Sequence, residues 1–233
     1  MGGNAYYSIV QMKPSLKLGK FALDFTHRDR FRFFSCQEVL SKESYRTLQG
    51  AFNEVPWVKK EAGFYTQYES FVQPSDKHAL ASLYDPAFFF PFKSKLEKQL
   101  GISLQNKLRL AAHKLITSDL IGVHNDYTDP ELGSENYRFI FQFAQKNQLI
   151  SGGELSFLAS RYTGEVIKKY GYSSNSGICF EITPYSFHSV TPVEGERHTL
   201  VAYLWEAGRK YDGSGTEIDE FKKSSGVGNR LFG

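Results

Sequence analysis

From residue 107 onward, the sequence is a series of short segments with strand character, separated by turns that contain Gly, Pro and Asn. These segments are 108–115, 137–144, 154–158, 166–172, 177–182 and 199–205, of which 137–144 (YRFIFQFA) has the strongest strand pattern. Short strands at close spacing are typical of an all-β sandwich or barrel. The aromatic content of 15% agrees with a β-rich fold, because aromatic side chains pack well on pleated surfaces.

Two segments with helical periodicity precede the strands. One covers 41–53, where Ser41 suits the N-cap, and the other covers 91–100, where Pro91 suits the first helical position and Gly101 the end. Each has an apolar face that must be buried against another element. The sequence therefore predicts a mainly β fold with N-terminal α-helices packed on one outer face.

The charge and the cysteine content indicate a cytoplasmic enzyme. The formal net charge of +3 is too small to indicate binding to nucleic acid or membranes. No apolar run approaches the ~18 residues of a membrane span, and the first residues lack the pattern of a signal peptide. The two cysteines, Cys36 and Cys179, suit a reducing compartment. We expect no membrane and no nucleic acid as partner, and the sequence leaves the oligomeric state open.

The chain is predicted to form one domain followed by a tail. No internal repeat or low-complexity linker interrupts residues 20–210, so we expect residues 1–210 to be a single domain. Residues 211–233 are polar and rich in Gly and Ser, most of all in 212–216 and 222–228. Such segments bury too little apolar surface to order themselves, which predicts a flexible C-terminal tail.

His124, Asp126 and His188 are candidate metal ligands. His124 and Asp126 are two residues apart, so they project to the same side of a strand. With His188 from another strand, they form the ligand set of a non-haem iron(II) site that leaves coordination positions open. Arg197, nine residues after His188, can offer its guanidinium fork to a carboxylate near the metal. This set predicts oxidation with O2, with a small dicarboxylic acid as co-substrate.

The sequence around these residues resembles the 2-oxoglutarate/Fe(II)-dependent oxygenases of the prolyl-hydroxylase-like branch. The resemblance covers about residues 107–206. It rests on His124-Asn125-Asp126, Gly152-Gly153-Glu154-Leu155, the segment 177–184 (GICFEITP), His188, Thr191-Pro192-Val193 and Arg197. The family pattern joins H-x-D, a G-G-E-L turn and a histidine that is followed nine or ten residues later by a basic residue.

The resemblance implies a fold, cofactors and roles for residues. The fold would be a double-stranded β-helix, or jelly roll, over about 107–206, braced by the N-terminal helices. The cofactors would be Fe(II), the co-substrate 2-oxoglutarate and O2, with ascorbate as a reductant. His124, Asp126 and His188 would bind the iron, and Arg197 the distal carboxylate of 2-oxoglutarate. Thr199 stands where the family often has a hydroxyl that joins the same carboxylate.

The sequence departs from the family pattern at two aromatic positions. The tyrosine usually found nine or ten residues before H-x-D is replaced by Lys114 and Leu115. The phenol at the end of the strand after H-x-D is also missing. Gln142 is a candidate substitute that would contact 2-oxoglutarate, although it can equally face outward, and Tyr137 is a second candidate. His113 is a further residue that can point into the site.

The predicted activity is hydroxylation of a small amino-acid-like or peptide-like substrate, with decarboxylation of 2-oxoglutarate to succinate. One alternative is a nucleic-acid demethylase of the same superfamily, but Tyr203 stands where those relatives have a second arginine. Another is a non-catalytic metal-binding β-barrel module, although structural zinc usually takes four protein ligands. The aromatic segment 63–72 is a candidate wall of the substrate cavity, and we expect 127–136 to be a mobile lid.

Overall fold

The computed structural model describes residues 13–144 and 150–219. The N-terminal part contains strands β1 (Ala22–His27), β2 (Phe33–Gln37), β3 (Val58–Ala62) and β4 (Tyr65–Val72), helices α1 (Lys42–Ala51) and α2 (Pro86–Leu100), and the 3-10 helices η1 (Phe52–Glu54) and η2 (Ala79–Tyr84). Within the described ranges, no helix has the length and apolar character needed to cross a membrane.

The rest of the described chain is built from strands. They are β5 (Lys107–Ile116), β6 (Ile121–His124), β7 (Tyr137–Phe143), β8 (Ser151–Gly152), β9 (Leu155–Leu158), β10 (Val166–Tyr170), β11 (Ser174–Glu181), β12 (His188–Val190), β13 (Val193–Glu194), β14 (Glu196–Leu204) and β15 (Thr216–Glu217). The 3-10 helix η3 (Pro130–Leu132) interrupts the connection from β6 to β7. Each strand segment that the sequence predicted overlaps one of these strands.

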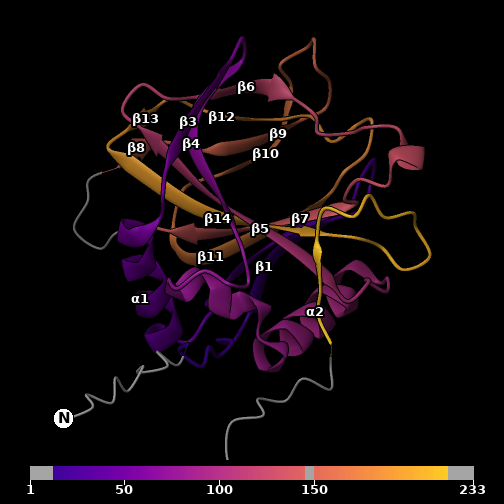
Figure 1. Cartoon of the computed structure of the whole chain (residues 1–233). Helices are drawn as coiled ribbons and strands as arrows, with labels where there is room; N and C mark the ends of the chain where they lie inside the picture. Colours follow the sequence, from indigo (N-terminus) through magenta and orange to yellow (C-terminus); the bar gives the residue numbers. More distant parts are fainter. Residues whose placement is uncertain (1–12, 145–149, 220–233) are drawn as a thin grey trace, which may run out of the picture.

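Apart from β8 and β13, which form a separate two-stranded sheet, the described strands form one antiparallel sheet that curls over itself. Its order is β1-β2-β11-β7-β14-β5-β4-β6-β12-β9-β10. A buried cluster joins the two ends of this order, because it contains Phe33 of β2, Phe180 of β11, Phe157 of β9 and Val190 of β12. The strands labelled β6, β12, β9 and β10 in Figure 1 therefore face the strands β11, β7, β14 and β5. The predicted mainly β jelly roll is confirmed.

The helices cover the outer face of the larger half of the sheet, as predicted (Figure 1). The Phe92 ring of α2 lies 5.0 Å from the Phe139 ring and 5.2 Å from the Phe141 ring of β7. Ser41 caps α1, because its hydroxyl accepts a hydrogen bond from the backbone N–H of Ser44. This contact confirms the predicted start of α1.

The start predicted for α2 was wrong. The helix begins at Pro86, five residues before Pro91, and the side chain of Asp85 caps it by accepting from the N–H of Ala87. Pro91 lies inside the helix. The missed residues carry Phe88 and Phe89, which are buried in the core between helix and sheet and hold the additional turns in place.

The residues from Tyr211 to Asp219, at the start of the predicted tail, make contacts with the rest of the fold. The side chain of Tyr211 packs edge-on against Trp205, with ring centroids 5.1 Å apart. Strand β15 pairs with β5, and Ile218 is buried in the core that contains the helices. Residues 216–218 thus pack on the domain, and the flexibility of the tail stays a prediction. Residues 220–233 of the predicted tail lie outside the described residues.

Candidate metal centre and co-substrate cavity

Strands β6 and β12 bring the three predicted metal ligands together. They pair antiparallel with His188 directly opposite His124, and the two imidazole centroids are 4.2 Å apart. Asp126 follows the end of β6. Its Oδ2 lies 3.2 Å from Nε2 of His188, and its Oδ1 lies 3.7 Å from Nε2 of His124. The candidate ligand atoms all lie within 4.8 Å of one another.

Backbone carbonyls fix the orientation of both imidazoles. Nδ1 of His124 lies 2.9 Å from the carbonyl oxygen of Gly122, and Nδ1 of His188 lies 2.9 Å from that of Ser186. A carbonyl oxygen can only accept, so each Nδ1 carries the proton and donates. In the neutral form of each ring, the lone pair is then on Nε2, the atom that faces Asp126. This arrangement is the one that metal-binding histidines require.

The surroundings of the ligands favour an ionised Asp126 beside a neutral His124. Burial, with His188 close by, lowers the pKa of His124 to about 4, so the ring is neutral at physiological pH. Burial alone would raise the pKa of Asp126, but the guanidinium of Arg138 and the two histidines outweigh it and hold that pKa well below its usual range. Asp126 therefore stays ionised although it is largely buried.

This donor set fits a ferrous ion. Across residues 13–144 and 150–219, the group has three members, two imidazoles and one carboxylate. Oδ2 of Asp126 is buried and lacks a well-aligned hydrogen bond. Three such ligands leave positions open for other molecules, whereas a structural zinc site is usually closed by a fourth protein ligand.

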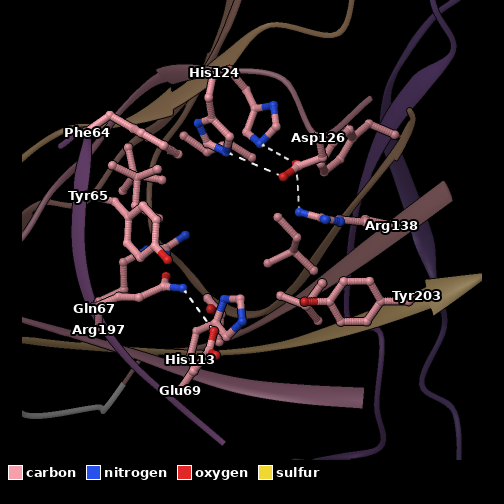
Figure 2. Close-up of a pocket in the computed structure, with 18 residues that line it drawn as sticks. Phe64, Tyr65, Gln67, Glu69, His113, His124, Asp126, Arg138, Arg197 and Tyr203 are labelled. Carbon is pink, nitrogen blue, oxygen red and sulfur yellow. Dashed lines mark hydrogen bonds and ion pairs between the residues drawn. The ribbon is translucent and has the colours of Figure 1, made fainter. Parts of the chain in front are cut away.

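A cavity of about 220 Å³ opens beside the three ligands. Figure 2 shows His124, Asp126 and Arg138 at one end and His113 and Glu69 at the other. Strands of both halves of the sheet line it, and the lining residues are Phe64, Tyr65, Gln67, Glu69, His113, Ile121, His124, Asp126, Arg138, Ile140, Leu155, Phe180, His188, Val190, Arg197, Thr199, Val201 and Tyr203. Five of the six predicted site residues line this one space.

Arg197 reaches the cavity as a buried cation without an anion. Its exposed fraction is 4%, and no described acidic side chain forms an ion pair with it. Its Nε is buried without a hydrogen-bond partner, and its guanidinium carbon lies 5.3 Å from the centre of the Tyr172 ring. Burial lowers the pKa of Arg197 to about 10, so the group is still charged at neutral pH. An unpaired buried charge is costly, which indicates that an anion belongs beside it.

Thr199 and His113 line the cavity beside Arg197. They are directly opposite each other on β14 and β5. Nε2 of His113 is buried without a partner, and burial lowers the pKa of His113 to about 3, so the ring is neutral. His113 is thus the cavity-facing neighbour of Lys114, one of the two positions at which the family pattern has a tyrosine. Lys114 points to the opposite face, where its Nζ lies 5.0 Å from the Trp57 ring.

The structure does not bring Gln142 to the cavity. Gln142 is opposite Thr199 on β7 but is not among the lining residues. Its amide oxygen accepts hydrogen bonds from the backbone N–H of Ser173, at 3.1 Å, and from the hydroxyl of Ser176, at 2.7 Å. These contacts turn the amide oxygen toward β11, which corrects the proposed role of Gln142 in binding 2-oxoglutarate. Tyr137, the other candidate, lies on the helix-covered face of β7.

Arg138 is the functional candidate that the sequence analysis missed. Its Nη1 lies 2.6 Å from Oδ2 of Asp126, and its guanidinium carbon lies 4.9 Å from the centre of the Tyr203 ring. The sequence does carry a signal for it, since Arg138 is the one charged residue in the strand segment 137–144. Its alternation with Ile140 places it on the inward face of that strand.

The predicted aromatic wall is confirmed in part. Phe64 and Tyr65 line the cavity, but Tyr68 and Phe71 do not. No residue of 127–136 is among the lining residues, so the mobile lid stays a prediction.

Comparison with known proteins identifies the fold. No protein-family model matches the sequence, and no curated protein matches it. Among solved structures, a prolyl-4-hydroxylase from Pseudomonas putida aligns with a TM-score of 0.59 and 12% identity, covering 76% of this chain and 92% of that chain. A 2OG-Fe(II) oxygenase family oxidoreductase from Burkholderia pseudomallei aligns with a TM-score of 0.55 and 15% identity, covering 73% and 83%.

A prolyl hydroxylase from Trichoplax adhaerens, solved with a peptide fragment of the hypoxia inducible factor oxygen degradation domain, is also similar. It aligns with a TM-score of 0.60 and 9% identity, covering 75% of this chain and 83% of that chain. The chain therefore has the jelly-roll fold of the prolyl-hydroxylase-like 2-oxoglutarate/Fe(II) oxygenases. In this fold it holds a His-Asp-His group and a buried arginine around one cavity.

Proposed function

We propose that the chain is an Fe(II)- and 2-oxoglutarate-dependent dioxygenase. In the proposed reaction, one oxygen atom of O2 becomes the hydroxyl of the product and the other enters succinate, while 2-oxoglutarate loses CO2. The observation that carries the proposal is the buried, unpaired Arg197 in the same cavity as His124, Asp126 and His188. A small dianion that spans this cavity can use a metal at one end and a guanidinium at the other.

The chain's own residues would hold the co-substrate. Arg197 can donate two parallel hydrogen bonds to the distal carboxylate, and the Thr199 hydroxyl can donate a third. The neutral His113 offers a further polar contact without adding a second positive charge. The buried apolar residues Leu155 and Phe180 also line the cavity and limit the water in it, and the Phe180 ring lies 5.0 Å from the His188 ring. A bound ferrous ion would supply the chemistry with O2 that protein side chains lack.

The substrate would be small and amino-acid-like or peptide-like. Phe64 and Tyr65 lie toward the exposed side of the cavity, since Phe64 is 45% exposed, and Tyr203 adds a third aromatic ring. A cavity of about 220 Å³ that also receives 2-oxoglutarate has room for only a short part of a substrate. The bound peptide of the Trichoplax neighbour supports a peptide-like substrate, in which one side chain enters the cavity.

Succinate release tests this function. The full chain is incubated with Fe(II), 2-oxoglutarate, O2 and ascorbate, and amino acids and short peptides are added one at a time as substrates. We expect succinate formation that needs iron and 2-oxoglutarate and is lost in His188→Ala. Metal binding without succinate formation against any of these substrates would contradict the proposal and favour a non-catalytic binding module. Activity on methylated DNA alone would favour the demethylase.

Arg197→Ala separates binding of the co-substrate from binding of the metal. Loss of hydrogen bonds to a charged group costs about 1.5–3 kcal/mol, so we expect the KM for 2-oxoglutarate to rise at least about tenfold. Mn(II) binding should be retained. Arg32→Ala is the matched control, because Arg32 pairs with Glu181 outside the cavity. An unchanged KM in Arg197→Ala would place the co-substrate anchor elsewhere.

A further inference from the structure

Arg138 forms the closest ionic contact that any described residue makes with the candidate metal ligands. Its Nη1 lies 2.6 Å from Oδ2 of Asp126, and Figure 2 shows the guanidinium extending into the cavity toward that carboxylate. The contact is an ion pair without the alignment of a hydrogen bond. Oδ1 of Asp126 lies 3.7 Å from Nε2 of His124.

Glu135 holds the rest of the Arg138 guanidinium. Its Oε1 accepts from Nε of Arg138 at 3.0 Å and from Nη2 at 2.7 Å, so two of the three guanidinium nitrogens are occupied. The other carboxylate oxygen of Glu135 accepts from Nη2 of Arg109 at 3.2 Å. Glu135 is only 8% exposed, so solvent screens these contacts weakly. The remaining nitrogen, Nη1, is the one that faces Asp126.

Tyr203 fixes the plane of the same guanidinium. The guanidinium carbon of Arg138 lies 4.9 Å from the centre of the Tyr203 ring, and that of Arg109 lies 4.2 Å from it. Tyr203 is 6% exposed, so its ring has little freedom to move. Arg138 is therefore held by a carboxylate and an aromatic ring, and it cannot swing freely away from Asp126.

We propose that Arg138, aimed by Glu135, is a positioning residue that holds the Asp126 carboxylate in its metal-binding orientation. The inference rests on the proposed function, because it assumes that Asp126 binds a metal. Groups that contact metal ligands in this way orient them, and their loss typically weakens metal binding 10- to 100-fold. Arg138 would act on metal binding through Asp126.

Arg138 also has an effect that opposes metal binding, so the direction in which metal affinity changes when Arg138 is removed decides between the two effects. Arg138 is a cation close to where a divalent ion would bind, so it could repel that ion and compete for Asp126. The negative charge of Glu135 offsets that repulsion. If orientation dominates, removal of Arg138 weakens metal binding. If repulsion dominates, removal of Arg138 strengthens it.

The experiment is a titration of the metal-free full chain with Mn(II) and with Co(II), by calorimetry and by visible absorption of bound Co(II). Arg138→Met should weaken binding about 10- to 100-fold and change the Co(II) spectrum. Arg138→Lys, which keeps the charge but not the fork, should recover part of the loss. Glu135→Gln should weaken binding less than Arg138→Met. Arg32→Met is the matched control, since Arg32 also pairs with a glutamate and lies 5.4 Å from a tyrosine ring, but outside the cavity.

Folding is checked by thermal unfolding of each metal-free variant. If Arg138→Met does not fold, Arg138→Lys and Glu135→Gln decide the question. Affinity that is unchanged or higher in the folded Arg138 variants would overturn the proposal. Wild type and His188→Ala together separate a failure of this proposal from a failure of the proposed function. If the wild-type protein binds no metal, the proposed function itself is refuted. Wild-type binding that is lost in His188→Ala would leave only the role of Arg138 in question.

Discussion

Burial keeps the two cavity histidines His113 and His124 neutral. It lowers the pKa of His113 to about 3, and the charges of Arg138 and Arg197 lower it further in the same direction. For His124, burial and the neighbouring His188 lower the pKa to about 4. A neutral imidazole can bind a metal or accept a hydrogen bond, whereas a protonated one can do neither. The cavity therefore keeps both rings in the form that the proposed chemistry needs.

This burial predicts that the metal-free protein loses stability in mild acid. A histidine titrates near 6.5 in the unfolded chain, and His113 titrates near 3 in the fold, so between these pH values the unfolded state binds more protons. Stability then rises with pH across this window and falls as the pH is lowered. At about 1.4 kcal/mol per pH unit, His113 alone accounts for a loss of about 2 kcal/mol between pH 6.5 and pH 5.

Urea unfolding of wild type, His113→Gln and His27→Gln at pH 5 and at pH 7 measures this effect. His27 is the control because it lies on β1, outside the lining of the cavity. His113→Gln should remove about 2 kcal/mol of the difference between the two pH values, and His27→Gln should keep it. Equal pH dependence in wild type and His113→Gln would contradict the prediction.

The grouping of the three candidate metal ligands could be predicted from the sequence, but the contact of Arg138 with Asp126 could not. His124 and Asp126 are close in sequence, and His188 belongs to a recognisable pattern, so residue type and spacing were sufficient. The contact between Arg138 and Asp126 depends on how one half of the jelly roll lies across from the other. The distance between the two halves is set by the packing of the core, and the spacing of residues along the chain does not determine it. Gln142 failed for a related reason, because its partners Ser173 and Ser176 come from the far side of β7.

The turn at Gly152 and Gly153 shapes the cavity through its backbone. Strand β8 pairs with β13, and both glycines have positive φ, at 70° and 67°. A Cβ at Gly153 would lie 2.9 Å from Cδ of Arg197. The turn therefore leaves just enough space for the buried arginine, and a glycine is needed here both for its conformation and for its size.

Gly153→Ala should weaken 2-oxoglutarate binding without affecting the metal ligands. The new methyl group would push the Arg197 side chain, and about 1 kcal/mol of stability would be lost because alanine disfavours positive φ. Gly164→Ala is the matched control, since Gly164 has a φ of 65° but nothing within 4 Å of its Cβ position. The measurement is the rise in Tm on adding 2-oxoglutarate with Mn(II). A rise that is equally reduced in both variants would show that backbone strain, and not the contact with Arg197, is responsible.

The boundaries of the elements were predicted best where a single residue determines them. Ser41 begins α1 and Gly101, with φ at 71°, ends α2, and both positions were predicted from residue type. The start of α2 was wrong because Pro86 and Pro91 both suit a first helical turn. The choice between them is made by burial of Phe88 and Phe89 under the sheet, which is a tertiary effect.

The two larger of the three buried clusters in the described residues support the helices and the cavity, respectively. One lies between the helices and the outer face of β7, β11 and β14, and the other fills the interior of the jelly roll next to the metal ligands. The C-terminal strand β15 joins the first core through Ile218, which is 4% exposed. Residues 216–218 thus belong to the domain and brace the side of the sheet that faces away from the cavity.

Ile218→Ala tests this assignment against a flexible tail. Removal of a buried isoleucine side chain costs about 2–5 kcal/mol, whereas a change in an unstructured tail costs almost nothing. Val166→Ala is the control, because Val166 is apolar but 47% exposed on β10 and should change stability by no more than about 0.5 kcal/mol. Urea unfolding of the metal-free protein gives both values. Because Ile218 lies in the core remote from the cavity, Mn(II) affinity should be unchanged in folded Ile218→Ala. If Ile218→Ala and Val166→Ala are equally stable, residues 216–218 belong to a flexible tail.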